Sequence, residues 1–210
     1  MSDDALSSEV VAKLEAGDEH AFAELFSQYR GRLKRMLEFR LDRRLRGRED
    51  PSDIIQEVYI DAHQRMRHYL KKPELSFYVW LRQLTAQRLI DVYRRHLKAE
   101  KRDIKQEVLI GGRSMVASSA SLAIHLVSNL TSPSQLAVRA EMISQIEDAL
   151  ESMEPLDREI LALRHFEELR NKEVAEVLGI KEAAASNRYV RALSKLRVAL
   201  EKLPGFFDKS

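Results

Sequence analysis

Apolar residues recur at spacings of three and four along most of this chain, and that periodicity places them on one side of an α-helix. The clearest run comprises Phe22, Leu25, Phe26, Tyr29, Leu33, Met36 and Leu37. Only seven glycines and five prolines occur in 210 residues, and these are the two residue types that most disfavour helix interiors. We find no strand pattern and no internal repeat. The sequence therefore predicts an all-α protein.

The predicted helices form two blocks. The first, residues 7–105, breaks at Gly47–Pro51 and Lys71–Pro73, which leaves three main helices. Ser52 or Asp53 is expected to cap the second of these helices, and the third begins near Leu75. The second block, residues 135–203, contains helical pieces near 135–152, 156–167, 171–178 and 182–201.

Residues 106–134, between the two blocks, are rich in Ser and Gly and poor in charge. This composition indicates a flexible linker, in which residues 121–130 could form a short amphipathic helix. The fold class that we predict is therefore two helical domains joined by a flexible linker.

Composition excludes several classes of protein. The chain has no cysteine, so a disulfide scaffold, a zinc finger of the cysteine type and a thiol nucleophile are ruled out. Residues Met1 to Leu6 are acidic and polar, unlike a signal peptide, and no apolar run approaches the 18 residues that a membrane helix needs. We expect a cytoplasmic protein without membrane insertion, cofactor or bound metal.

Residues 171–200 carry the most informative motif. Val174, Ala175 and Leu178 form the apolar face of a short helix, and Gly179 permits the left-handed exit that often ends a helix. The following helix has an apolar face and, opposite it, the polar residues Ser186, Asn187, Arg191 and Lys195. A short helix, a glycine turn and a longer basic helix are typical of a DNA-binding helix-turn-helix. An ordinary helical hairpin is the alternative.

Two further motifs lie in the first block. Asp53, Gln56 and Glu57 share one helical face, which indicates a polar docking surface or a solvated face. A carboxylate pair or a metal site is disfavoured there, because His63 is out of phase with these residues.

The third predicted helix combines aromatic with basic residues: Phe77, Tyr78 and Trp80, then Arg82, Arg88, Arg94, Arg95, Lys98, Lys101 and Arg102. Aromatic rings beside basic groups suit single-stranded nucleic acid, whose bases stack and whose phosphates pair with cations. The alternative is that Trp80 belongs to the core.

Together these motifs resemble bacterial RNA polymerase sigma factors of the extracytoplasmic-function (ECF) group. The run DIIQE at Asp53–Glu57 looks like the segment that docks on the polymerase β′ clamp helices. The run FYVWLRQLTAQRLIDVYRR at Phe77–Arg95 looks like the segment that melts and reads the minus-ten promoter element. The helix-turn-helix at Asn171–Lys195, preceded by LDREILALRHFEEL, looks like the segment that reads the minus-thirty-five element and contacts the β flap.

The resemblance assigns residues to roles. Polymerase binding is expected of Asp53, Gln56 and Glu57. Minus-ten contacts are expected of Lys71, Lys72, Trp80, Gln87, Arg88, Asp91, Arg94, Arg95 and Lys98, with the loop Tyr69–Ser76, Gln87 and Asp91 around a flipped-out base. Minus-thirty-five contacts are expected of Arg170, Lys172, Ala184, Ser186, Asn187, Arg188, Val190, Arg191 and Lys195, where Arg188 and Lys195 lie nearer the phosphates.

The partners implied by the resemblance are core RNA polymerase and promoter DNA. No further domain is expected after Ser210, so control would come from another protein, such as an anti-sigma factor, or from expression. The sequence differs from the family at Gln87, where Asn is common, and at Ala184 and Ser186, which shorten the side chains of the recognition helix.

Two other classes of protein were weighed. A dimeric helix-turn-helix regulator would use the same DNA-reading helix on palindromic half-sites, but it leaves the DIIQE face and the aromatic-basic helix without a role. A helical enzyme lacks a nucleophile with a base, a glycine-rich phosphate loop and a ligand cluster. We therefore predict a promoter-specificity factor and not an enzyme.

Overall fold

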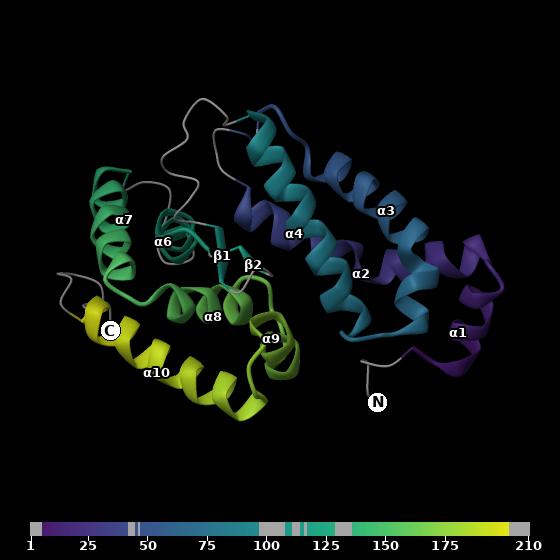
Figure 1. The fold of residues 1–210 in the computed structure, drawn as a ribbon. Coiled ribbons are helices and arrows are strands. Elements are labelled where there is room, and N and C mark those ends of the chain that lie inside the picture. The colour runs from purple at the N-terminus through teal and green to yellow at the C-terminus, as the bar shows by residue number, and fades with distance from the viewer. Residues whose placement is uncertain are drawn as a thin grey trace. The chain divides into compact units, whose positions relative to one another are not determined.

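The computed structural model divides the chain into two compact units, Met1–Lys105 and Gln106–Ser210. It describes residues 6–41, 45, 47–96, 108–110, 114–115, 117–128 and 136–201. The described residues are mostly helical, as the apolar periodicity predicts, and Figure 1 shows the order of the elements along the chain.

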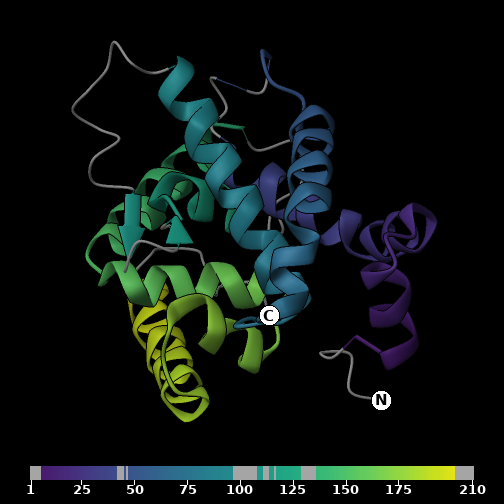
Figure 2. The ribbon, with the colours of Figure 1, turned by 45° about the vertical axis from the view of Figure 1, so that its right-hand side comes forward.

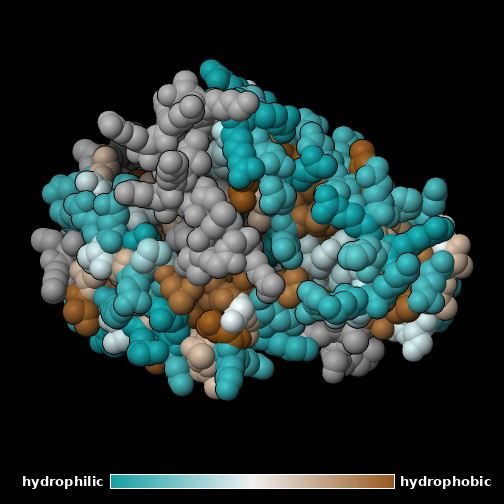
Figure 3. Space-filling model, viewed as in Figure 1, coloured by the Kyte–Doolittle hydropathy of each residue, from teal (hydrophilic) through white to brown (hydrophobic). Residues whose placement is uncertain are grey.

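The first unit contains four described helices: α1 (Ser8–Glu15), α2 (Glu19–Arg40), α3 (Pro51–Lys71) and α4 (Phe77–His96). Helices α2, α3 and α4 pack on one another and enclose one core, and they lie side by side in Figure 1 and Figure 2. Side chains from all three helices, such as Leu33, Val58 and Leu81, are fully buried in that core. The surface above it is mostly hydrophilic on the face drawn in Figure 3.

Side-chain caps start the helices of this unit. The Asp18 carboxylate accepts the backbone N–H groups of His20 and Ala21, at 3.0 Å each, at the start of α2. Asp50 does the same for α3 by accepting the N–H of Ser52 at 2.7 Å, with Pro51 as the first helical residue. The prediction that Ser52 or Asp53 caps α3 is therefore wrong by two or three residues, because proline extends the helix to its own position.

The second unit contains helices α7 (Leu136–Glu151), α8 (Pro155–His165), α9 (Asn171–Leu178) and α10 (Glu182–Leu200). These agree closely with the four helical pieces predicted from the sequence. Helix α10 packs on α7, α8 and α9 through Ala185, Ala192, Leu196 and Leu200, which are buried. The core of this unit is completed by Ile146, Leu150 and Ile160, all fully buried.

Residues 106–134 are not uniformly the slack linker that their composition indicates. Helix α6 (Ser119–Ser128) packs against α7, and its Leu122, Ala123 and Val127 are buried. Its start is fixed by a hydrogen bond in which the backbone N–H of Ala117 donates to the buried Glu159 carboxylate at 2.8 Å. Composition does not reveal this packing, because the segment mixes serines with apolar residues. Those apolar residues become buried only through contact with another helix.

A short antiparallel pair of strands, β1 (Val108–Ile110) and β2 (Ser114–Met115), also lies in this segment. Val108 pairs with Met115, and Ile110 pairs with Ser114. The sequence predicts no strand because three apolar residues are too few to show a period, although Val and Ile favour extended backbone.

Candidate promoter and polymerase contact sites

The predicted docking residues lie on the outer face of α3. Asp53 and Gln56 are exposed and Glu57 is half-buried, whereas Ile54, Ile55 and Val58 face the core. The structure thus keeps all three predicted residues on a solvent-facing surface, as the helical spacing requires.

Ile60 lies one turn beyond Gln56 and is 56% exposed. Sequence analysis missed this residue, because an isoleucine in an amphipathic helix is ordinarily assigned to the core. Its position on α3 places an apolar side chain one turn from Gln56, which is one of the residues predicted to dock on polymerase.

The aromatic side chains of α4 are divided between core and surface. Phe77 and Tyr78 are buried, while Trp80 is half-buried and stacks on Tyr69 with ring centroids 4.6 Å apart. The Tyr69 hydroxyl in turn donates to the carbonyl of Leu75 at 3.0 Å, which orders the turn between α3 and α4. Trp80 therefore belongs partly to the core, as the alternative reading holds, and keeps one edge in contact with solvent.

Polar residues follow along the outer side of α4. Gln87, Arg94 and Arg95 are exposed, and the Asp91 carboxylate lies 3.4 Å from the Gln87 amide and 3.7 Å from the Arg94 guanidinium. Gln87 and Asp91 are therefore neighbours, as expected for residues that surround one base. Lys98 lies outside the described residues.

Two other cations of the aromatic-basic run, Arg82 and Arg88, are less exposed than Arg94 and Arg95. Arg82 is 1% exposed and is part of the core, so it offers no surface for nucleic acid. The side chain of Arg88 lies 3.8 Å from Glu57 and 4.0 Å from Asp61 on α3. Lys71, the last residue of α3, is exposed, and the exposed Lys72 that follows it contacts Glu74 at 2.8 Å.

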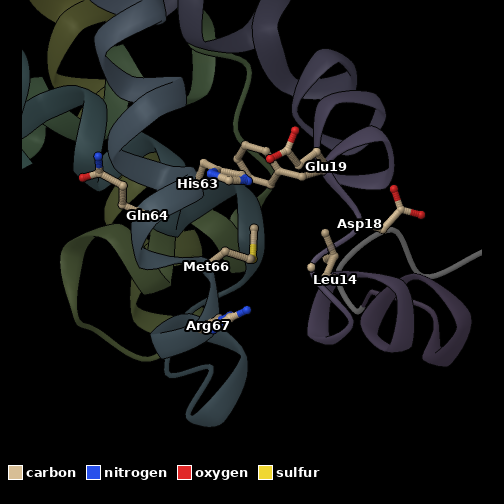
Figure 4. Close-up of a pocket in the computed structure, with 9 residues that line it drawn as sticks. Leu14, Asp18, Glu19, His63, Gln64, Met66 and Arg67 are labelled. Carbon is tan, nitrogen blue, oxygen red and sulfur yellow. The ribbon is translucent and has the colours of Figure 1, made fainter.

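A pocket of about 370 Å³ lies between α3 and the junction of α1 with α2. Figure 4 shows Leu14 and Met66 in its wall, with His63 and Arg67 from α3 opposite Asp18 at the start of α2. It contains none of the predicted polymerase-binding or minus-ten residues.

The helix-turn-helix is present in the second unit. Gly179 adopts the left-handed conformation, with φ at 65°, and ends α9. The N–H of Ile180 donates to the carbonyl of Ala175 and that of Gly179 to the carbonyl of Glu176, the two bonds of a Schellman motif. No heavy atom lies near a Cβ added at Gly179, so the positive φ and not crowding favours glycine there.

The start of each helix of the motif is fixed locally. The backbone N–H of Arg170 donates to the buried Glu173 carboxylate at 2.7 Å, which caps α9. Lys181 precedes α10 without a side-chain cap, as its residue type predicts, and the Asn171 amide instead donates to the carbonyl of Glu182 at 3.0 Å. This bond ties the first turn of α10 to the first turn of α9.

The outer face of α10 presents short and polar side chains. Ala184, Ser186, Asn187, Val190 and Arg191 are exposed, and Val190 is 62% exposed. Arg170 and Lys172, at the start of α9, are exposed as well. These are seven of the nine residues predicted to contact the minus-thirty-five element.

The remaining two residues pair with acidic side chains of the same unit, although Lys195 is 52% exposed. Arg188 donates to the Asp157 carboxylate at 2.8 Å and to Glu154 at 3.1 Å. Lys195 donates to the other oxygen of Asp157 at 2.6 Å. That Arg188 and Lys195 lie nearer the phosphates stays a prediction, and in this structure both side chains pair with the Asp157 carboxylate of α8.

Comparison with known proteins gives the same division of the chain. The model of the family described as Sigma-70 region 2 matches residues 25–99, which include α3 and α4, and the model described as Sigma-70, region 4 matches residues 143–196, which include the helix-turn-helix. The chain belongs to the sigma-70 family of RNA polymerase sigma factors, in its extracytoplasmic-function group.

Individual relatives match this chain at low to moderate sequence identity. The chain is 35% identical over 151 residues to the probable RNA polymerase sigma factor RfaY of Xanthomonas campestris, covering 69% of this chain and 32% of that protein, so it spans about a third of RfaY's length. It is 21% identical over 203 residues to the ECF RNA polymerase sigma-E factor of Haemophilus influenzae, covering 97% of this chain and all of that protein.

A solved structure shares the fold. CnrH, determined in complex with the cytosolic domain of CnrY, matches with a TM-score of 0.51 at 19% identity, covering 91% of this chain and 95% of that chain. None of the described helices of the present chain is both long and apolar enough to span a membrane.

Proposed function

We propose that this chain is a dissociable specificity subunit that binds core RNA polymerase and directs it to particular promoters. Asp53, Gln56 and Glu57 would dock on the β′ clamp helices. The unwound minus-ten strand would be contacted by Lys71, Lys72, Trp80, Gln87, Arg88, Asp91, Arg94, Arg95 and Lys98. The exposed face of α10 would enter the major groove of the minus-thirty-five element, and the same unit would contact the β flap.

One observation carries this proposal. Asp53 and Gln56 on α3, Gln87, Arg94 and Arg95 on α4, and Ser186, Asn187 and Arg191 on α10 are exposed, while apolar side chains of the same helices build two separate cores. Three polar surfaces on two units suit a factor that contacts one enzyme and two promoter elements at once. Joining two weak contacts in one chain raises their combined affinity through the effective concentration of the second contact.

The test is reconstituted transcription. The purified chain is added to core polymerase with genomic promoter fragments, and run-off transcripts are measured with and without it. We expect transcripts that depend on the chain. Transcription that is independent of the chain, together with a stable dimer on a palindromic site, would instead support the dimeric regulator.

We also propose that a regulatory protein of the anti-sigma type holds this chain away from polymerase. Support comes from CnrH, which shares the fold and was solved bound to the cytosolic domain of CnrY. Such a partner should compete with core polymerase for the purified chain in a gel-filtration assay. A ternary complex that still transcribes would contradict an inhibitory role.

A further inference from the structure

Asp157 occupies an unusual position for an acidic residue. It lies in the first turn of α8, its side chain is 3% exposed, and its two oxygens accept hydrogen bonds from two different cations of the recognition helix α10. One oxygen takes Arg188 at 2.8 Å and the other takes Lys195 at 2.6 Å. Arg188 and Lys195 lie two turns apart on α10, so a single carboxylate pairs with two positions of that helix.

Arg188 and Lys195 are the cations of α10 that pair with this buried carboxylate. The Arg188 side chain is only 27% exposed and has a second acidic partner in Glu154, at 3.1 Å. Arg191 lies between them in sequence and is exposed, and within the described part of the chain no carboxylate pairs with it. Of the four cations of α10, Arg188 and Lys195 thus pair with Asp157, and Arg197 pairs with Glu201 at the end of the helix. Arg191 faces solvent.

The burial of Asp157 affects how Arg188 and Lys195 can respond to approaching DNA. A phosphate that draws the 27%-exposed Arg188 or the 52%-exposed Lys195 away from Asp157 leaves that buried carboxylate short of partners, which is unfavourable. An exposed arginine gives up only water and counterions when it meets a phosphate. The arrangement therefore favours contacts by Arg191 and opposes contacts by the two paired cations.

We propose that Asp157 is a positioning residue that acts as an internal counterion for the recognition helix. It holds Arg188 and Lys195 against α8, and it limits DNA contact along this part of α10 to Ser186, Asn187, Val190 and Arg191. This inference rests on the proposed function, in that α10 is taken as the helix that meets DNA. It means that this helix reads its site mainly with short side chains and one arginine, which keeps sequence-independent attraction to DNA low.

The first test compares two substitutions that change the net charge equally. Lys195→Gln and Arg191→Gln are made separately in the full chain, and binding to a labelled random-sequence duplex is followed by fluorescence anisotropy at several salt concentrations. Each phosphate contact contributes about 0.9 to the slope of log affinity against log salt. We expect R191Q to lower the slope by about 0.9 and K195Q to leave it unchanged. Equal losses in the two variants would overturn the proposal.

The second test removes the counterion. Asp157→Asn keeps the shape of the side chain but not its charge, so both cations become available. Two additional phosphate contacts would make affinity for the random duplex fall about tenfold more between about 50 and 200 mM salt than it does for the unmodified chain. An unchanged slope in a folded D157N chain would overturn the proposal, since a purely stabilising aspartate changes the melting temperature and not the number of phosphates bound.

Matched controls separate this effect from net charge. Glu201→Gln removes an acid that pairs with Arg197 at 2.7 Å at the far end of α10, and Glu154→Gln removes the exposed partner of Arg188 while keeping Asp157. Both should retain the slope of the unmodified chain, and a slope as steep as that of D157N in either variant would contradict the special role of Asp157. If D157N does not fold, as circular dichroism would show, the K195Q and R191Q pair still decides the question.

These measurements contain no polymerase. A chain that supports run-off transcription but shows equal slopes for K195Q and R191Q would lose this inference and keep the proposed function. A chain that shows the expected difference between those variants but supports no transcription would keep the inference about α10 and lose the proposed function.

Discussion

The carboxylate of Glu57 lies 3.8 Å from the guanidinium of Arg88, so the proposed docking face of α3 and the proposed DNA-contacting helix α4 share an ion pair. The two side chains are 44% and 35% exposed. An ion pair this open to water contributes at most about 1 kcal/mol to stability. Both residues can therefore exchange this contact for one with polymerase or promoter DNA at little cost to the fold.

The docking face can be tested on that basis. Gln56→Ala together with Glu57→Ala should reduce affinity for core polymerase at least tenfold, equivalent to about 1.4 kcal/mol, because two exposed polar contacts are lost. The melting temperature should stay nearly unchanged. The control is Gln64→Ala, an exposed glutamine two turns further along α3. Equal polymerase affinity in the double variant and the control, measured by fluorescence anisotropy, would show that polymerase binds elsewhere.

Gln87 offers a test of minus-ten recognition. Its amide is exposed and lies 3.4 Å from Asp91, so replacing it with alanine should leave stability intact but remove a base contact. Discrimination among bases at one promoter position should fall by about 1–3 kcal/mol. Competition between single-stranded oligonucleotides for the chain bound to core polymerase measures this, with Gln28→Ala on α2 as the control. A base preference that survives Q87A would assign the reading of that base to another residue.

Arg82 should matter for stability. Arg82 is 1% exposed within α4. Removing a buried cation leaves the polar groups that pair with it buried and unpaired, which is unfavourable. Arg82→Ala should therefore destabilise the first unit by about 3 kcal/mol or more, as seen in urea unfolding. Arg95→Ala, an exposed arginine on the same helix, should cost less than about 0.5 kcal/mol. Similar unfolding midpoints for the two variants would contradict the burial of Arg82.

Glu159 on α8 accepts the N–H of Ala117 and so links the start of α6 to the rest of the second unit. Glu159→Ala should destabilise this unit by about 1–3 kcal/mol, because a buried donor loses its acceptor. The amides of residues 117–128 should exchange faster with deuterium. Glu159→Gln should be milder, because the side-chain carbonyl still accepts a hydrogen bond. Unchanged exchange in E159A would mean that α6 is held by its apolar contacts alone.

His165 gives the second unit a pH dependence. Burial, and to a lesser extent the neighbouring Arg164, lowers the pKa of this imidazole below its ordinary value of 6.5. As the pH falls below about 6.5, the unfolded chain takes up a proton more readily than the folded one, so the free energy of unfolding decreases. The loss should begin near pH 7 and continue as the pH falls further.

Replacing His165 with glutamine tests that direction. Thermal unfolding between about pH 7 and pH 5 should show a smaller loss of stability in H165Q, because its side chain does not titrate in this range. The imidazole Nε2 lies 3.0 Å from the Tyr189 hydroxyl, so Tyr189→Phe separates the loss of this contact from the loss of the titrating group. An equal pH dependence in H165Q and the unmodified chain would contradict the assignment.

Much of this molecule follows from local sequence. The spacing of apolar residues predicts α2, α3 and α4 and the four helices of the second unit, because each helix must bury one stripe of its surface. Gly179 predicts the left-handed end of α9, since few other residues adopt that conformation without strain. The same periodicity predicts that Asp53, Gln56, Ser186, Asn187 and Arg191 face solvent.

Contacts between distant residues settled the rest. Arg82 and Arg95 are indistinguishable by composition, yet one lies in the core because α4 turns that side toward α2 and α3. Helix α6 packs on α7, whereas the sequence offers only the possibility of a short helix at 121–130 within a linker. Asp157 lies 31 residues from Arg188 and 38 from Lys195, separations over which no sequence periodicity applies. Only folding brings that carboxylate to α10, and so only the tertiary structure decides which cations of the recognition helix remain available to DNA.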